Sequence, residues 1–176
     1  IGAVSLVGLD DTTLLAESGF NLYGINTNTG SSFYIDTIGF QASGDLTWYD
    51  ENLYLVTSAG QIIKMTLDNS VSSILSIAPI GSNLPTCEGA VTASFTEDFN
   101  SIVGFNGPDL IKICQIDGSH QLLCPSLNVG GTPGAASIRL ASQTPTPTTC
   151  SMTSIDEVSN DTDFLIFPNP ANESIS

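Results

Sequence analysis

Residues 43–81, SGDLTWYDENLYLVTSAGQIIKMTLDNSVSSILSIAPIG, read as four short strands joined by tight turns. Apolar and polar residues alternate along them, with Ile63, Met65 and Leu67 on one face and Lys64 and Thr66 on the other. A period of two is typical of a strand whose two faces meet different surroundings. The stretch therefore predicts a four-stranded antiparallel sheet, around which the rest of the chain is organised.

Copies of this stretch lie on either side of it. Each copy opens with an acidic turn, runs through an apolar strand, breaks at Gly19, Gly60 or Gly107, and ends in Ile-Gly or Val-Gly. One further strand precedes each copy. Self-similarity at this period, with four strands in every unit and few helix signals, indicates a β-propeller rather than a leucine-rich or helical repeat. The three copies are DDTTLLAESGFNLYGINTNTGSSFYIDTIG (10–39), DENLYLVTSAGQIIKMTLDNSVSSILSIAPIG (50–81) and DFNSIVGFNGPDLIKICQIDGSHQLLCPSLNVG (98–130).

The predicted fold class is all-β, a β-propeller fragment of three four-stranded blades followed by a lone strand at Ala135–Ala141. Residues 1–142 make up this partial ring. Three blades cannot close a ring, and open sheet edges invite association. We therefore expect the native chain to begin upstream of Ile1, with the lone strand completing a blade supplied by that upstream part.

The phrase LYGINTNTG at 22–30, followed by an alternating strand, resembles blades of secreted bacterial β-propellers of the YncE-like and LVIVD-like kind. The resemblance covers most of residues 2–142. It implies the propeller fold and a secreted location, and it does not specify a task.

The composition excludes two classes of function. Three basic and eighteen acidic residues give a formal charge of −15, and 41% of the residues are hydrophobic. So acidic a chain repels phosphate backbones and anionic lipid surfaces, which argues against nucleic acid as a partner. No apolar run approaches the roughly 20 residues of a transmembrane helix. A soluble β-protein with a buried core is expected.

The cysteines predict disulfides. Cys87, Cys114, Cys124 and Cys150 make an even number, which in an exported chain favours oxidised pairs, and none of them has metal-site spacing. Cys114 and Cys124 lie on the two arms of a hairpin that turns at residues 117–118, so we expect them to pair, leaving Cys87 for Cys150. The alternative is that they are buried free thiols that pack as small apolar residues.

The composition changes after Ser142. Residues 143–163 are rich first in threonine and proline and then in acidic residues, which predicts an extended linker. Residues 164–176, FLIFPNPANESIS, run from an apolar strand into a Pro-Asn-Pro turn. Their sorting motif resembles the start of the type A C-terminal sorting domain of the Bacteroidetes type IX secretion system, although the later strands of that domain are absent. The motif consists of Phe167, Pro168, Asn169, Pro170, Ala171, Asn172 and Ile175.

This second resemblance implies a route and a location. The type IX machinery would be a partner of the chain, carrying it from the periplasm across the outer membrane. The protein would then be secreted or held at the outer cell surface.

A search for catalytic groups finds none. The only histidine, His120, lies in a predicted turn, and zinc would lack nitrogen and sulfur ligands. The acidic pairs at 10–11, 50–51 and 97–98 occupy equivalent turns. This indicates that they stabilise those turns rather than act as a pair of catalytic carboxylates. We expect no enzyme and no cofactor, except that such oxygen-rich turns would suit Ca²⁺.

The direction of the strands predicts where a ligand binds. First-to-second and third-to-fourth turns gather eight of the eighteen acids at one face of the propeller. The opposite face carries longer loops rich in glycine, serine and proline, where recognition usually resides. The candidate ligand-binding residues of this loop face are Phe20, Asn83, Leu84, Asn106 and Pro108.

The function predicted from these observations is a secreted or cell-surface, non-catalytic binding or structural module. A glycan or a surface protein is the expected ligand, as for an adhesin. The alternative is a targeting or accessory domain of a secreted hydrolase whose catalytic part lies upstream.

Overall fold

The computed structural model describes residues 5–81, 84–85, 87, 89–95 and 99–126, which contain twelve β-strands and no helix. The strands form three four-stranded antiparallel sheets, each with its strands in chain order. The predicted all-β class and the three four-stranded units are thus confirmed. The first sheet holds β1 (Ser5–Gly8), β2 (Thr13–Ser18), β3 (Asn21–Asn26) and β4 (Ser32–Thr37); the second β5 (Ala42–Tyr49), β6 (Asn52–Thr57), β7 (Ile62–Leu67) and β8 (Ile74–Ile80); the third β9 (Gly89–Phe95), β10 (Phe99–Asn106), β11 (Asp109–Ile113) and β12 (His120–Cys124).

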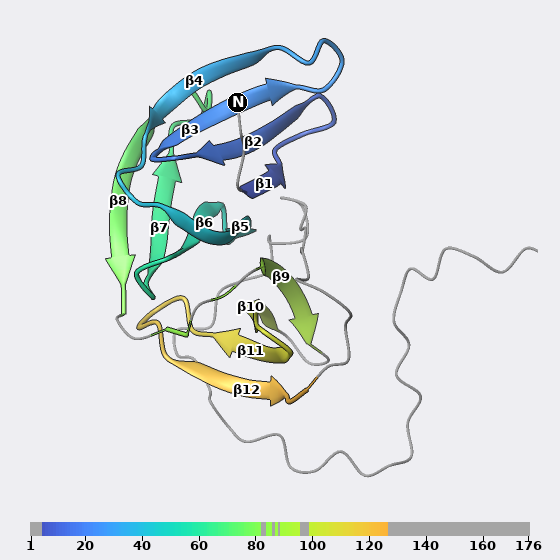
Figure 1. The fold of residues 1–176 in the computed structure, drawn as a ribbon. Coiled ribbons are helices and arrows are strands. Elements are labelled where there is room, and N and C mark those ends of the chain that lie inside the picture. The colour runs from blue at the N-terminus through green and yellow to red at the C-terminus, as the bar shows by residue number, and fades with distance from the viewer. Residues whose placement is uncertain (1–4, 82–83, 86, 88, 96–98, 127–176) are drawn as a thin grey trace, which may run out of the picture.

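The three sheets follow one another along an arc, with β1, β5 and β9 on its inner side (Figure 1). The strand expected at 135–141, the linker at 143–163 and the sorting motif at 164–176 lie outside the described residues, so they stay predictions. Within the described ranges, no helix has the length and hydropathy of a membrane span.

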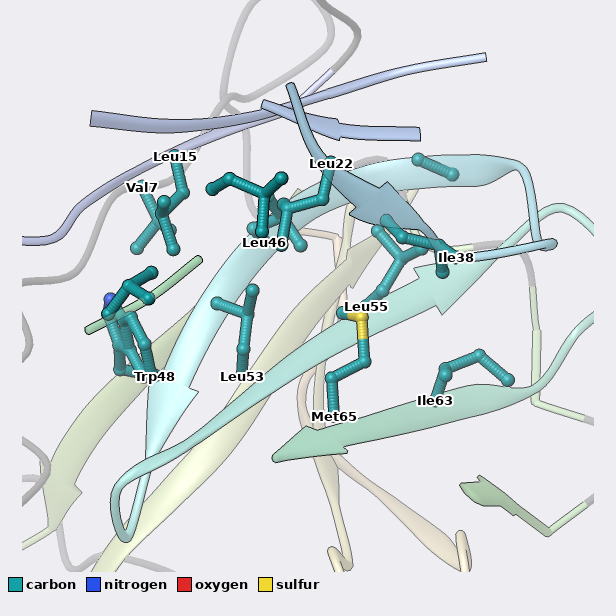
Figure 2. Packing of buried hydrophobic residues seen from close by; sticks show 13 residues of the cluster. Val7, Leu15, Leu22, Ile38, Leu46, Trp48, Leu53, Leu55, Ile63 and Met65 are labelled. Atoms are coloured by element: carbon teal, nitrogen blue, oxygen red, sulfur yellow. The ribbon is translucent and has the colours of Figure 1, made fainter. Parts of the chain in front are cut away.

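The first hydrophobic core fills the space between the first and second sheets. Figure 2 shows Val7, Leu15 and Leu22 of the first sheet facing Leu53 and Met65 of the second. These side chains are almost completely buried, at 0 to 2% exposed. Removal of their apolar surface from water stabilises the contact between the two sheets.

The second core joins the second sheet to the third. Tyr54 and Val56 point into it from β6, and Ile102 and Ile113 point into it from the third sheet. Since Leu53 and Leu55 of β6 belong to the first core, the second sheet is buried on both faces. This burial explains why β6 contains the continuous apolar run at residues 53–56 rather than an alternating pattern.

Turn residues end the strands where the sequence predicts. Gly19, Gly60 and Gly107 follow the second strand of each sheet, and all three have positive φ values between 57° and 71°. Glycine adopts this left-handed conformation without steric cost. Asp50 and Glu51 have φ values of 46° and 59°, which gives β5 and β6 a tight hairpin turn.

Specific contacts tie neighbouring sheets together. The Trp48 Nε1–H donates a hydrogen bond of 2.8 Å to the Gly8 carbonyl, joining the innermost strands of the first two sheets. The Ile74 N–H donates to the Asp36 carboxylate at 3.0 Å, joining their outer strands. Gly81 lies against Gly118 of the third sheet so closely that a Cβ on Gly81 would come within 2.8 Å of the Gly118 Cα. These contacts fix how the sheets stack along the arc.

Candidate functional site

The end of the sheets that carries the second-to-third turns is the predicted loop face. Phe20 is 54% exposed there, and its carbonyl accepts hydrogen bonds from the Ile38 and Gly39 N–H groups at 2.7 and 3.1 Å. The segment leaving β4 therefore holds this turn in place. An exposed aromatic ring on a rigid turn is ready to contact a ligand with little loss of conformational entropy.

The other predicted ligand residues are distributed unevenly. Pro108 is exposed in the β10–β11 turn and Asn106 is half-buried at the end of β10, so both lie on the third sheet while Phe20 lies on the first. Leu84 is only 5% exposed and packs in the second core, where its N–H donates to the Gly60 carbonyl at 2.9 Å. Asn83 lies outside the described residues. The four described residues of the set therefore do not form one cluster.

Glu17 is a buried polar residue that the sequence pattern does not single out. Its side chain is 0% exposed on the face of β2 that packs toward the second sheet, and neither carboxylate oxygen accepts a hydrogen bond of normal geometry. Ser5, its partner on β1, is 1% exposed and its hydroxyl also has no hydrogen-bond partner. Buried polar groups without partners are rare and often mark functional positions.

The environment of Glu17 favours its neutral form. Burial raises the pKa of the Glu17 carboxyl, and the nearby Ala42 N–H opposes this only in part. A protonated carboxyl there would donate a hydrogen bond, whereas a carboxylate would need a cation. Comparison of the three sequence copies could have marked Glu17 as unusual. The equivalent positions hold apolar residues, Val56 in the second sheet and Phe105 in the third.

The opposite end of the sheets carries acidic turns whose carboxylates bond within their own turns. Asp10 accepts hydrogen bonds from Thr12, and Asp117 accepts from Ser119. Hydrogen bonds from Ser70 and Ser72 lower the pKa of Asp68 to about 2. Among the residues that the structure describes, no three acidic, histidine or cysteine side chains group as a metal site. Calcium binding stays an untested prediction.

The two predicted disulfide pairings are wrong. Cys87 and Cys124 carry free thiols, so neither Cys114–Cys124 nor Cys87–Cys150 forms. Cys124 lies opposite Leu110 at one end of the β11–β12 hairpin, whereas Cys114 follows Ile113 at the other end. Four residues of strand separate those two ends by about 13 Å, beyond the reach of a disulfide. Cys150 lies outside the described residues.

The two free thiols should differ in reactivity in the folded protein. Cys87 is 0% exposed, and burial raises its pKa to about 11, so only about one molecule in a thousand carries the thiolate at pH 8. Cys124 is partly exposed. We expect iodoacetamide to modify Cys87 at least about 100-fold more slowly than Cys124.

Peptide mass spectrometry of a time course without reductant measures both rates. Denaturation before labelling provides the control, because both thiols should then react. Failure of Cys124 to react after denaturation would show that it is oxidised and would contradict the structure.

His120 is exposed at the first residue of β12. The only histidine of the chain thus lies at a strand end rather than in a buried cluster.

Comparisons with known proteins do not identify a family. No family model matches the chain, and no curated protein matches it. A solved structure of a luciferin-regenerating enzyme has 16% sequence identity and a TM-score of 0.47, and the match covers 68% of this chain and 44% of that one. An auxiliary nutrient-binding protein from Bacteroides thetaiotaomicron has 10% identity and a TM-score of 0.40, covering 62% of this chain and 32% of that one. The chain spans less than half the length of either protein.

These comparisons correct one prediction. The expectation that the chain is not an enzyme is contradicted, because a structure that matches part of this fold is named an enzyme. A shortage of histidine and metal ligands disfavours particular mechanisms but not catalysis in general. No activity of that protein is transferred to this chain.

Proposed function

We propose that residues 5–126 form three blades of a β-propeller that binds a glycan or a protein outside the cell, through the loop face. The observation that carries the proposal is the exposed ring of Phe20 on a turn held by two backbone hydrogen bonds. Aromatic rings stack on sugar faces and anchor protein contacts, and they do so best when already fixed in position. The acidic turns at the opposite end would keep the module soluble.

Binding should depend on the loop face. The triple variant Phe20→Ala, Asn83→Ala and Asn106→Ala should weaken binding to the preferred oligosaccharide of an immobilised glycan array by at least about 100-fold, because the aromatic anchor and two amides are lost. The matched control is the triple variant Asp10→Asn, Asp68→Asn and Asp117→Asn, which neutralises the acidic turns. It should leave binding unchanged.

Circular dichroism checks that both triple variants keep the wild-type fold. Loss of binding in the acidic-turn variant, with the loop-face variant unaffected, would overturn the assignment. Absence of any array ligand, together with absence of a protein ligand in a surface-protein capture experiment, would refute the binding function itself.

We also propose export by the type IX secretion system, on the resemblance of the sorting motif at 167–175. Deletion of the chain from Phe164 onward, including the rest of any sorting domain, should leave the protein in the periplasm. Cell fractionation and immunoblotting measure its distribution between periplasm and medium. Secretion at the normal level after this deletion would refute the route, without bearing on the ligand.

A further inference from the structure

A buried polar pair, Glu17 and Ser5, lies where the first sheet packs on the second. The two residues are direct partners on β2 and β1, so their side chains leave the same face of the first sheet. Glu17 is 0% exposed and Ser5 is 1% exposed. The face that they occupy packs against β5 of the second sheet, and both of these sheets lie within the described residues.

Apolar side chains surround the pair on its own sheet. Leu22 is the partner of Glu17 on β3, Leu15 is the next residue of β2 on the same face, and Val7 is the partner of Leu15 on β1. All three are at most 2% exposed in the first core. The Ala42 N–H at the start of β5 also approaches the Glu17 carboxyl. A carboxylate in such surroundings is costly unless a positive group compensates its charge.

The oxygen atoms of the pair are unsatisfied. Within the described part of the chain, neither Glu17 carboxyl oxygen and not the Ser5 hydroxyl has a hydrogen-bond partner of normal geometry. The two side chains thus do not bond to each other, although they are neighbours across the strands. A proton on the carboxyl does not remedy this, because the acid is itself a donor that needs an acceptor. A small cation between the two side chains satisfies all three oxygen atoms at once.

The charge of the pair favours a monovalent cation. It contains one carboxylate, whose single negative charge Na⁺ or K⁺ neutralises in full. A divalent ion would leave a net positive charge among apolar side chains, and protein sites for Ca²⁺ supply six to eight oxygen ligands. The formal charge of −15 attracts cations to the protein as a whole.

We propose that Glu17 and Ser5 bind an alkali cation, Na⁺ or K⁺, between the first and second sheets. The Glu17 carboxylate supplies the charge that holds the ion, and the Ser5 hydroxyl supplies a further oxygen ligand. The site belongs to the first sheet, because the equivalent pair of the third sheet is Phe105 and Gly89. In buffers without Na⁺ or K⁺ the carboxyl has no partner, and its burial lowers the stability of the chain.

The ion would also brace the turn that carries Phe20. The backbone between β4 and β5 is bound to that turn, because the Ile38 and Gly39 N–H groups donate to the Phe20 carbonyl. Three residues after Gly39, the Ala42 N–H approaches the Glu17 carboxyl. An ion at Glu17 therefore lies where β2, the segment that holds the turn, and the start of β5 meet. Binding of the ion does not depend on the ligand proposed for the loop face.

Thermal unfolding in three chloride salts tests the site. At neutral pH and equal ionic strength, the Tm of the full chain should be at least about 3 °C higher in NaCl or KCl than in tetramethylammonium chloride. The reason is that tetramethylammonium is too large to enter between the two sheets. Equal ionic strength gives equal screening of the charge of −15, so that effect cancels. Equal Tm values in all three salts would overturn the proposal.

Glu17→Gln separates this site from general effects of the salts. The amide keeps the size and polarity of the side chain but carries no charge, so the Tm difference between the salts should disappear. Ser5→Ala removes one ligand and should reduce the difference. The matched control Asp11→Asn removes one exposed acidic charge and should keep the full difference. A difference that persists undiminished in Glu17→Gln would place the ion elsewhere and overturn the proposal.

A crystal structure determined in the salt that raises the Tm more shows the ion directly. It should contain the alkali ion in contact with the Glu17 carboxylate and the Ser5 hydroxyl. This measurement uses the wild-type chain, so it decides the question even where a substitution impairs folding. A Glu17 carboxyl without an ion in that structure would overturn the proposal.

Discussion

Replacement of Trp48 by alanine should lower the free energy of unfolding by about 3–5 kcal/mol. Trp48 is 1% exposed in the first core, where it contacts both the first and second sheets. The change removes a large apolar ring and also leaves the Gly8 carbonyl without its 2.8 Å hydrogen bond. Domains of this size have a total stability of about 5–15 kcal/mol, so the loss is a large part of it.

Urea denaturation followed by circular dichroism measures the Trp48→Ala effect. Trp48→Phe separates its two causes, because phenylalanine keeps most of the apolar contact but cannot donate to Gly8; we expect a loss of about 1–3 kcal/mol. Leu75→Ala, at a position 67% exposed, should change stability by less than about 0.5 kcal/mol. A Trp48→Ala loss as small as that of Leu75→Ala would contradict the role of Trp48 in joining the two sheets.

The second large effect is a gain of stability on replacing Glu17 by valine, the residue at the equivalent position of the second sheet. At pH 7 we expect the free energy of unfolding to rise by about 1–3 kcal/mol, because a buried group without hydrogen-bond partners is removed. This corresponds to an increase in Tm of several degrees for a chain of this size, at about 2–4 °C per kcal/mol.

The gain should depend on pH in a defined direction. Burial raises the pKa of Glu17 above its ordinary value of 4.5, so well below pH 4.5 the carboxyl is neutral in both the folded and unfolded states. As the pH rises from there through the folded-state pKa, the unfolded chain ionises first, and stability is lost. The advantage of Glu17→Val over wild type should therefore grow between pH 4.5 and neutrality.

Urea denaturation of both proteins at several pH values measures this difference. Comparing variant with wild type cancels the contributions of the other carboxylates, which the two chains share. Glu17→Gln is the matched control: it removes the ionisation but keeps a buried polar group, so it should lose the pH dependence without the full gain. A stability difference that stays constant from pH 4.5 to pH 7 would contradict the burial of this carboxyl.

The cysteines illustrate the limit of local reasoning. The hairpin containing Cys114 and Cys124 follows from the turn residues at 117–118, and the structure contains that hairpin as β11 and β12. The two cysteines nevertheless lie at opposite ends of that hairpin, because Cys114 comes just before the turn whereas Cys124 lies opposite Leu110 at the far end. Equal spacing from the turn, and not membership of the same hairpin, decides whether two sulfur atoms face each other.

In the candidate site, too, some properties follow from local sequence and others only from tertiary contacts. Phe20 and Pro108 are exposed in short turns. Their positions directly after Gly19 and Gly107, which end strands, predict this exposure. Leu84 lies in a loop segment, yet it is buried because that segment folds under the Gly60 turn into the second core. Burial of a loop residue depends on which sheet lies beneath it, and so on contacts between distant parts of the chain.

The sequence by itself determined that the chain is all-β, that it contains three four-stranded units, and where the hairpins turn. The physical reason is that alternation with a period of two and turn-forming glycines act over a few neighbouring residues. Only the tertiary structure decided which face of each sheet is covered, and that Glu17 is buried without a hydrogen-bond partner among the described residues. Those properties arise from the stacking of sheets, where residues forty positions apart, such as Gly8 and Trp48, come into contact.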